Sequence, residues 1–278
     1  MARVATMTVW DVQLGLAIHV KAPNGKYIVI DLGTGTYNAS PLRKRMFDNI
    51  AYMIITHPHL DHISDILNFD NNPPKVLCRP DSLTNEEIME GVRYCDKAKF
   101  EQYCRISNRY CAPLNPDNEN HPENPDNYGG LKIQTFSTSA CDHSNFNNFS
   151  IITVLEFAGI KVVVCGDNEK DSFDKLMKES DFKNAVRGAD VLVAPHHGRE
   201  SAYYSDFVSL VNPRITIISD TTKSDASAVD KYTQKSRGWK VRGEERKCLT
   251  TRNDGNITVE FGESTTPGRS VLGIYTSK

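Results

Sequence analysis

Residues 54–62 have the sequence Ile54-Ile55-Thr56-His57-Pro58-His59-Leu60-Asp61-His62, in which three histidines and one aspartate fall within six positions. Imidazole nitrogens and carboxylate oxygens are ligands that zinc, iron(II) and manganese accept in proteins. The apolar run before the cluster predicts a buried strand, and at strand spacing His57 and His59 project to the same side. Asp61 and His62 then stand where the next helix is expected to begin. Since the whole chain has eight histidines, this cluster predicts a metal site rather than a polar loop.

The composition of the 278-residue chain indicates a globular protein with one sizeable domain or two small ones. A formal net charge of −2 gives no overall basic field that would recruit nucleic acid, although a metal and a local groove can still bind phosphate. Seven scattered cysteines do not suggest a disulfide framework. No apolar run reaches the ~18 residues of a membrane span, and the N-terminus has no cleavage signal. We therefore expect a cytoplasmic protein that does not act at a membrane.

Strands and helices alternate along most of the chain, which predicts an α/β fold. Strands are expected at residues 7–12, 15–21, 26–30, 51–55, 76–78, 131–136, 149–157, 160–164, 189–194 and 215–219. Helices are expected at residues 40–49, 61–69, 84–106, 171–179, 201–211 and 227–237. The segment 248–261 is expected to form a β-hairpin that turns at Asn253-Asp254-Gly255.

The region from about residue 78 to residue 130 is expected to be an insertion near the active site of a single domain spanning residues 1–278. Thr84-Asn85-Glu86-Glu87 is a capping box that opens its helix. Residues 111–130 are rich in Pro, Asn, Asp and Glu and are too long for an ordinary connection. Two interpretations of this second segment stay open, namely a substrate lid and a surface loop.

Two later polar motifs also follow directly on predicted buried strands. They are Cys165-Gly166-Asp167 and Pro195-His196-His197-Gly198, and strand ends at one edge of a sheet are where α/β proteins assemble their sites. His143 lies on a loop that can reach the same edge. Each motif alone is a weak signal, but together with the first cluster they offer about seven ligands, enough for two metal ions. A carboxylate has two oxygens to share between two cations, and Asp167 is the best candidate for this bridge.

Two metal ions would hold a water between them and lower its pKa, so that hydroxide forms near neutral pH. The chain has no Gly-x-Ser-x-Gly elbow and no cysteine directly beside a histidine. The metal site is therefore expected to supply the nucleophile. A structural zinc site would favour cysteine ligands, so a set rich in histidine and aspartate favours an open, catalytic site.

The motif in residues 57–62 resembles the H-x-H-x-D-H motif of the metallo-β-lactamase-fold hydrolases. The chain is also similar to that superfamily at Asp31-Leu32-Gly33, at His143 and at Gly166-Asp167. Within the superfamily it looks most like the hydrolase domain of competence DNA-uptake proteins, and this resemblance covers nearly the whole chain except residues 78–130. It rests on the segments Trp10-Asp11-Val12, Asn147-Asn148-Phe149-Ser150, Cys165-Gly166-Asp167, 194–198 and 250–259. The resemblance implies a four-layer αβ/βα sandwich with the site at one edge of the paired sheets.

The resemblance also implies a ligand set for two divalent ions, zinc in the first place, with manganese or iron as alternatives. The first ion would be held by His57, His59 and His143. The second would be held by Asp61, His62 and one histidine of the pair 196–197, with Asp167 bridging. Related proteins use the histidine before the glycine, which is His197, so that His196 would orient substrate or move a proton. The side chains expected to act in catalysis are Asp61, His196 and Arg199.

The function expected first is that of a phosphodiesterase or nuclease, in which two cations neutralise a phosphodiester and hydroxide attacks it. Nucleic acid is then a possible substrate. Arg199 stands where the competence-type motif has serine, and it is a candidate contact to a phosphate oxygen. The insertion offers further candidates at Lys97, Lys99, Arg105 and Arg109. The alternative is hydrolysis of a carboxylic ester, lactone, thioester or β-lactam, and a redox or non-enzymatic role is disfavoured because the full ligand set is retained.

Overall fold

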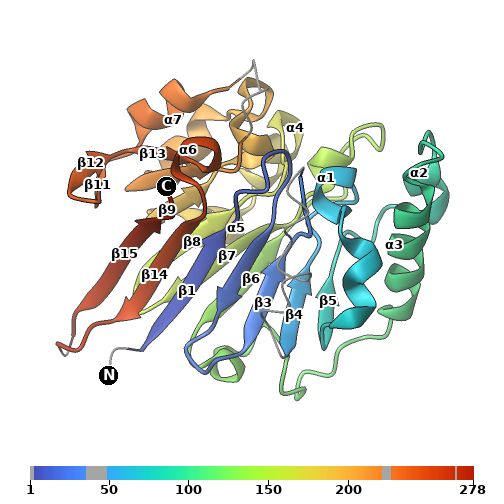
Figure 1. Ribbon diagram of the computed structural model, residues 1–278, viewed down its shortest axis with the longest axis horizontal. Coiled ribbons are helices and arrows are strands. Elements are labelled where there is room, and N and C mark those ends of the chain that lie inside the picture. Colours follow the sequence, from blue (N-terminus) through green and yellow to red (C-terminus); the bar gives the residue numbers. More distant parts are fainter. Residues whose placement is uncertain (1–2, 36–48, 221–226, 267) are drawn as a thin grey trace.

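The computed structural model describes residues 3–35, 49–220, 227–266 and 268–278 (Figure 1). Two mixed sheets pack face to face, with helices on the outer side of each. Within the described residues the strand order is β15-β14-β1-β2-β3-β4-β5 in the first sheet and β13-β10-β9-β8-β7-β6 in the second. This arrangement confirms the predicted four-layer αβ/βα sandwich.

The first sheet consists of β1 (Val4–Val9), β2 (Ile18–Lys21), β3 (Tyr27–Ile30), β4 (Ile50–Ile54), β5 (Val76–Cys78), β14 (Ile257–Glu263) and β15 (Ser270–Thr276). The second consists of β6 (Lys132–Phe136), β7 (Ile152–Phe157), β8 (Ile160–Val164), β9 (Val191–Val193), β10 (Ile215–Ile218) and β13 (Cys248–Thr250). The helices are α1 (Leu60–Ile63), α2 (Asn85–Met89), α3 (Lys97–Arg109), α4 (Lys170–Leu176), α5 (Ser180–Val186), α6 (Ser205–Val211), α7 (Val229–Lys235) and α8 (Thr251–Asp254). A small ribbon pairs β11 (Trp239–Val241) with β12 (Glu244–Arg246).

The apolar run before the histidine cluster is buried because β4 lies inside the first sheet and is covered on both faces. Tyr52 and Ile54 point into the core between the two sheets. Met53 and Ile55 belong to a second core beneath α1 and α3. Parallel strands that are covered on both faces have continuous apolar sequences, and β4 pairs in parallel with β3 and β5. The strand that delivers the cluster is therefore held rigidly by packing on each side.

The insertion differs from the single long helix predicted for residues 84–106. The capping box at Thr84 and Glu87 is present and opens α2, but α2 ends at Met89. Gly91 has a φ of +68°, a left-handed conformation that continues no helix. The chain then starts again as α3. Likewise, the helix predicted for residues 61–69 is the short α1 followed by a 3-10 helix at Ile66–Asn71.

Residues 111–130 pack at the end of the first sheet that lies away from the histidine cluster. Lys26 Nζ is 3.0 Å from Asn120 Oδ1, and Arg3 donates to the Gly129 carbonyl at 2.7 Å. Lys26 directly precedes β3, whereas the cluster lies beyond the opposite ends of β3 and β4. The substrate-lid interpretation of this segment is therefore wrong, and it is a surface loop.

The hairpin predicted for residues 248–261 is also wrong. β13 pairs in parallel with β10 in the second sheet, whereas β14 pairs with β1 and β15 in the first. Between them Asn253-Asp254 completes the short helix α8, and Gly255 with a φ of +71° ends it. The chain thus crosses from one sheet to the other. The helix expected at residues 40–49 falls almost entirely outside the described residues. Among the described residues, no helix has both the length and the apolar character needed to cross a membrane.

Candidate metal centre

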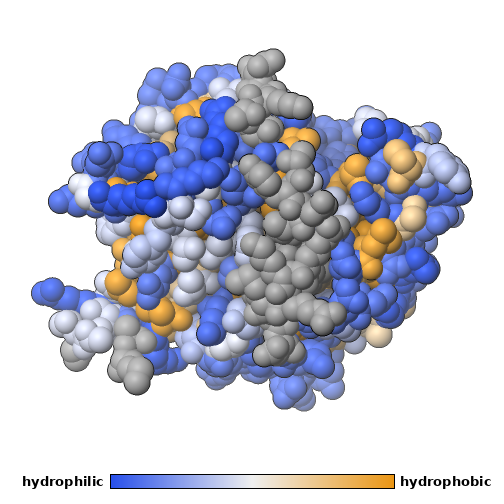
Figure 2. Space-filling view, viewed as in Figure 1, coloured by the Kyte–Doolittle hydropathy of each residue, from blue (hydrophilic) through white to orange (hydrophobic). Residues whose placement is uncertain are grey.

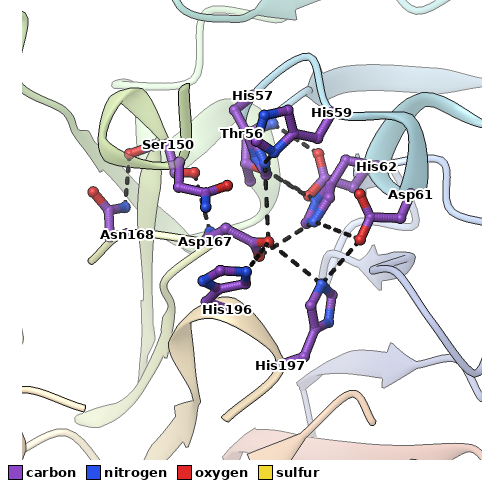
Figure 3. Close-up of polar contacts among 12 residues, drawn as sticks. Thr56, His57, His59, Asp61, His62, Ser150, Asp167, Asn168, His196 and His197 are labelled. Atoms are coloured by element: carbon purple, nitrogen blue, oxygen red, sulfur yellow. Dashed lines mark hydrogen bonds and ion pairs between the residues drawn. The ribbon is translucent and has the colours of Figure 1, made fainter. Parts of the chain in front are cut away.

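The predicted site residues follow the carboxyl ends of strands from both sheets. Asp31 follows β3, the stretch 55–62 follows β4, residues 165–167 follow β8 and residues 194–198 follow β9. Since β3 pairs in parallel with β4 and β8 with β9, the carboxyl ends of each pair lie at one edge of their sheet. Figure 3 shows that the side chains from the two edges meet around Asp167.

Four of these side chains form a group that could hold a metal ion. Asp61, His62, Asp167 and His197 each offer one ligand atom, and these atoms lie within 4.8 Å of one another. His197 Nε2 is 3.3 Å from Asp61 Oδ2 and 3.4 Å from Asp167 Oδ2, while His62 Nε2 is 3.2 Å from Asp167 Oδ1. Both Nε2 atoms are buried and make no well-aligned hydrogen bond within the described residues. Such nitrogens facing two carboxylates fit a bound divalent cation.

The other nitrogen of each imidazole in this group is held by a partner behind it. His62 Nδ1 lies 2.7 Å from Asp31 Oδ2, and His197 Nδ1 lies 3.0 Å from the Ser219 carbonyl oxygen. Asp31 is fully buried and also accepts hydrogen bonds from the backbone and hydroxyl of Thr56, both at 2.7 Å. Metal-binding histidines usually have such a partner, because it fixes the tautomer and turns the free nitrogen towards the ion.

Three more histidines lie around Asp167. His57 Nε2 is 3.0 Å from His59 Nδ1 and 3.9 Å from Asp167 Oδ2. His196 Nε2 is 3.8 Å from the same carboxylate oxygen, and its Nδ1 is 2.8 Å from Glu169 Oε1. In Figure 3 His57 and His59 lie above Asp167, and His196 and His197 lie below it. Imidazoles therefore face this carboxylate from several sides.

His196 and His197 both reach the cluster because of an unusual backbone. Their φ angles are +46° and +54°, in the left-handed region that costs a non-glycine residue about 1–3 kcal/mol. In extended backbone, two consecutive side chains point to opposite sides. The two left-handed residues place both imidazoles beside Asp167 instead. Strain of this kind is concentrated at functional sites.

The structure does not bring His143 to the other predicted ligands. Its side chain is 43% exposed, and its Nδ1 is 2.7 Å from Glu87 Oε1 at the start of α2. Its ring also packs edge-on against Phe149. Sequence reasoning placed His143 at the edge from its loop alone, and it missed Glu169 and the role of Asp31. The signal for Glu169 was its position two residues after Asp167 in the same motif.

The carboxylates and imidazoles of the cluster shift one another's pKa values. Burial raises the pKa of Asp167, but His62 and His197 outweigh burial and hold it well below its usual range. Burial lowers the pKa of His197, but Asp167 and Asp61 outweigh burial and raise it to about 9. The pKa of His62 is raised well above its usual value by the same carboxylates and Asp31, against burial. In the metal-free protein, protons on these two imidazoles thus occupy the place of a cation.

The predicted phosphate contacts are mostly engaged elsewhere. Lys97 pairs with Glu101, Lys99 with Asp96 and Arg109 with Asp70. Arg199 is half-buried and follows the histidine pair, and its backbone nitrogen donates to the His196 carbonyl at 3.0 Å. Arg199 therefore follows directly on the turn Pro195–Gly198, which carries two histidines of the cluster.

Residues 12–219 match the model of the metallo-beta-lactamase superfamily. The chain belongs to this superfamily, as predicted, and its His/Asp cluster is that of a metal-dependent hydrolase. It is distantly similar to ComE operon protein 3 of Bacillus subtilis, with 22% identity over 230 residues. The match covers 75% of this chain but 27% of the relative, so the chain spans about a quarter of that protein.

Solved structures show the same fold at low sequence identity. A mutant of the CmlA beta-hydroxylase is 10% identical with a TM-score of 0.55, and the match covers 91% of this chain and 53% of that one. Unliganded yeast PDE1 is 14% identical with a TM-score of 0.47, over 81% of this chain and 90% of that one. The likeness to the CmlA beta-hydroxylase mutant, with a TM-score above 0.5, concerns the fold alone.

Proposed function

We propose that this protein is a phosphodiesterase whose hydrolytic centre holds two divalent metal ions. The observation that carries this proposal is that four imidazole Nε2 atoms, those of His57, His62, His196 and His197, lie within 3.9 Å of the Asp167 carboxylate. Asp61, His62 and His197 would hold one ion, and the other would be held by the set His57, His59 and His196, with Asp167 shared. In this arrangement His196 takes the place that the sequence resemblance gave to His143. Zinc is the first candidate metal, with manganese or iron as alternatives.

When bound, the two ions neutralise the charge of a phosphodiester and lower the pKa of a water between them. The chain's own residues have separate tasks. Asp31 and Glu169 hold the imidazoles of His62 and His196 so that each Nε2 faces Asp167. Asp61 is the most exposed member of its group, and its low pKa keeps it ionised at neutral pH. We infer that it would orient the attacking water, because a carboxylate with a lowered pKa is a weak proton acceptor. Arg199 would meet a phosphate oxygen.

A second candidate function is hydrolysis of a carboxylic ester, lactone or β-lactam-like molecule at the same centre. The observation in its favour is that three of the insertion's cations form local ion pairs. A site for a long polyanion would leave more of its cations free to meet phosphates. The charge balance of the insertion therefore favours a small substrate over a nucleic-acid duplex.

The two functions can be separated with the purified protein loaded with zinc, manganese or iron(II). Bis-p-nitrophenyl phosphate and an oligonucleotide test the first, and p-nitrophenyl acetate and a lactone test the second. We expect turnover of the phosphodiester in at least one metal condition and its loss in Asp167→Asn. Hydrolysis of the ester or lactone, with no phosphodiester cleaved under any metal condition, would overturn our first choice.

A further inference from the structure

A pocket of about 320 Å³ lies beside His59 at the edge of the candidate metal centre. Six of its eleven lining residues are apolar, and we call it the insertion pocket. Its apolar lining residues are Pro58, Leu60, Ile88, Val92, Phe100 and Phe146. A volume near the lower end of the roughly 300–1,000 Å³ typical of small-molecule sites accommodates one compact group.

The insertion builds the outer wall of this pocket. Ile88 is on α2, Val92 is on the loop that follows it and Phe100 is on α3. Figure 1 shows α2 and α3 beside α1, which carries the end of the histidine cluster. In Figure 2 apolar surface is visible on the right of the molecule, over this same region. Residues that the sequence places in a separate segment thus complete a cavity next to His59.

Aromatic side chains form part of the wall. Phe146 is stacked on His59, with ring centroids 6.0 Å apart and planes 28° apart. Phe146 and Phe100 are both half-buried and pack against the core beneath α1 and α3. Packing of this kind holds a ring in place, and a fixed aromatic ring is a good platform for another flat ring.

The charges around the insertion pocket do not suit a phosphate. Its charged lining residues are Glu90, Arg93 and Asp96. Arg93 is already bound to Asp96, with Nη2 2.6 Å and Nε 2.9 Å from its Oδ2. Lys99 Nζ lies 3.9 Å from the same carboxylate. Two carboxylates and two cations therefore lie around the pocket, and these residues leave no excess positive charge to attract a phosphate.

We propose that the insertion pocket binds a neutral, flat aromatic group, of the size of one nucleobase, that is attached to the phosphate under attack. The phosphate half of this substrate rests on the proposed function, whereas the aromatic half rests on the pocket. A substrate of this kind places its charge at the cluster and its ring against Phe146. The insertion pocket would then select those phosphodiesters whose phosphate is attached to such an aromatic group.

Binding of three phosphate monoesters to the zinc-loaded protein tests this proposal by titration calorimetry. Thymidine 5′-phosphate carries a base, 2-deoxyribose 5-phosphate lacks it, and phenyl phosphate has an aryl ring in its place. We expect thymidine 5′-phosphate to bind about tenfold more tightly than 2-deoxyribose 5-phosphate. A similar gain for phenyl phosphate would show that any aryl ring is accepted, and a smaller gain would show that the base itself is recognised. The ratio between the first two ligands is the readout.

Two pocket variants and one control make the test specific. Phe146→Ala and Val92→Ser are expected to bring the ratio close to one while the affinity for 2-deoxyribose 5-phosphate stays the same. Val92 is on a partly exposed loop, so Val92→Ser remains informative if Phe146→Ala fails to fold. Tyr275→Ala changes an exposed aromatic residue on β15 and is expected to leave the ratio unchanged.

A ratio near one in the wild-type protein, or an unchanged ratio in both pocket variants, would overturn the inference. The outcome is separable from that of the proposed function. Base-dependent binding without hydrolysis of any phosphodiester would contradict the proposed function alone. Hydrolysis of phosphodiesters without base-dependent binding would contradict the insertion pocket's role alone.

Discussion

Raising the pH of the metal-free protein is expected to destabilise it, because protons on His62 and His197 balance the buried carboxylates. The pKa of His197 rises from 6.5 to about 9, since Asp167 and Asp61 outweigh the effect of burial. A group whose pKa is higher in the folded than in the unfolded state stabilises the folded protein by its full amount when the pH is below the unfolded pKa. This stabilisation is lost as the pH rises through the folded pKa. For His197 the loss falls between about pH 6.5 and pH 9.

The size of the effect follows from the pKa difference. At 1.36 kcal/mol per pKa unit, the shift of His197 corresponds to about 3 kcal/mol of unfolding free energy. His62 acts in the same direction, because its pKa is also raised. His57 and His59 have lowered pKa values, chiefly through burial, so they favour folding increasingly as the pH rises towards 6.5. The stability of the metal-free protein should therefore be greatest near pH 6.5.

Urea unfolding between pH 6 and pH 9.5, with a chelator or with saturating zinc, measures this effect. The loss above pH 6.5 is expected in the chelated protein and not in the loaded one, where cations take the place of the protons. His197→Gln is expected to remove about 3 kcal/mol of the loss and to leave the part that comes from His62. His121→Gln, which changes a histidine outside the cluster, is expected to leave it unchanged. Constant or increasing stability of the chelated wild-type protein from pH 6.5 to pH 9 would refute this reasoning.

Four substitutions test how the centre is assembled. Asp31→Asn is expected to lower the metal affinity about 10- to 100-fold, because it orients His62 less firmly. Competition with a chelating dye measures this affinity. An unchanged affinity would show that the contact between Asp31 and His62 is dispensable. His196→Ala is expected to reduce the metal content from about two equivalents to one, whereas His143→Ala is expected to keep both. Elemental analysis measures the metal content of each variant. Loss of one equivalent in His143→Ala, with both kept in His196→Ala, would make His143 the ligand. Glu169→Gln is expected to lower the affinity for one of the two metal ions about tenfold in the same dye titration. Unchanged affinity for both ions would argue against a role of Glu169 in orienting His196.

Local patterns predicted the parts of this structure that depend on neighbouring residues. The run before His57 predicted a buried strand because β4 is covered on both faces. The capping box predicted the start of α2 because its hydrogen bonds lie within four residues. Similarity to the superfamily predicted the layers, and the strand ends brought Asp61, His62, Asp167 and His197 to one place.

The misses concern contacts between distant segments. The hairpin predicted for 248–261 failed because the turn signal at Asn253-Asp254-Gly255 serves equally well to end a helical turn. The assembly of the two sheets decides whether β14 pairs with β13 or with β1. A local sequence pattern holds no information on that assembly. The backbone conformation of His196 and His197 could not be predicted either, because the surrounding fold holds two non-glycine residues in a left-handed conformation. The sequence therefore could not show that both imidazoles face Asp167.

One loop, residues 143–146, determines both that His143 lies away from the other predicted ligands and that Phe146 lines the insertion pocket. The loop turns His143 outwards to Glu87, whose other carboxylate oxygen caps α2 at Thr84. Three residues later it turns Phe146 inwards to stack on His59. If His143 pointed towards the ligands, α2 would lose this tether and the pocket would lose the anchor of its outer wall. The loop thus joins the insertion to the candidate metal centre through its contacts with Glu87 and His59.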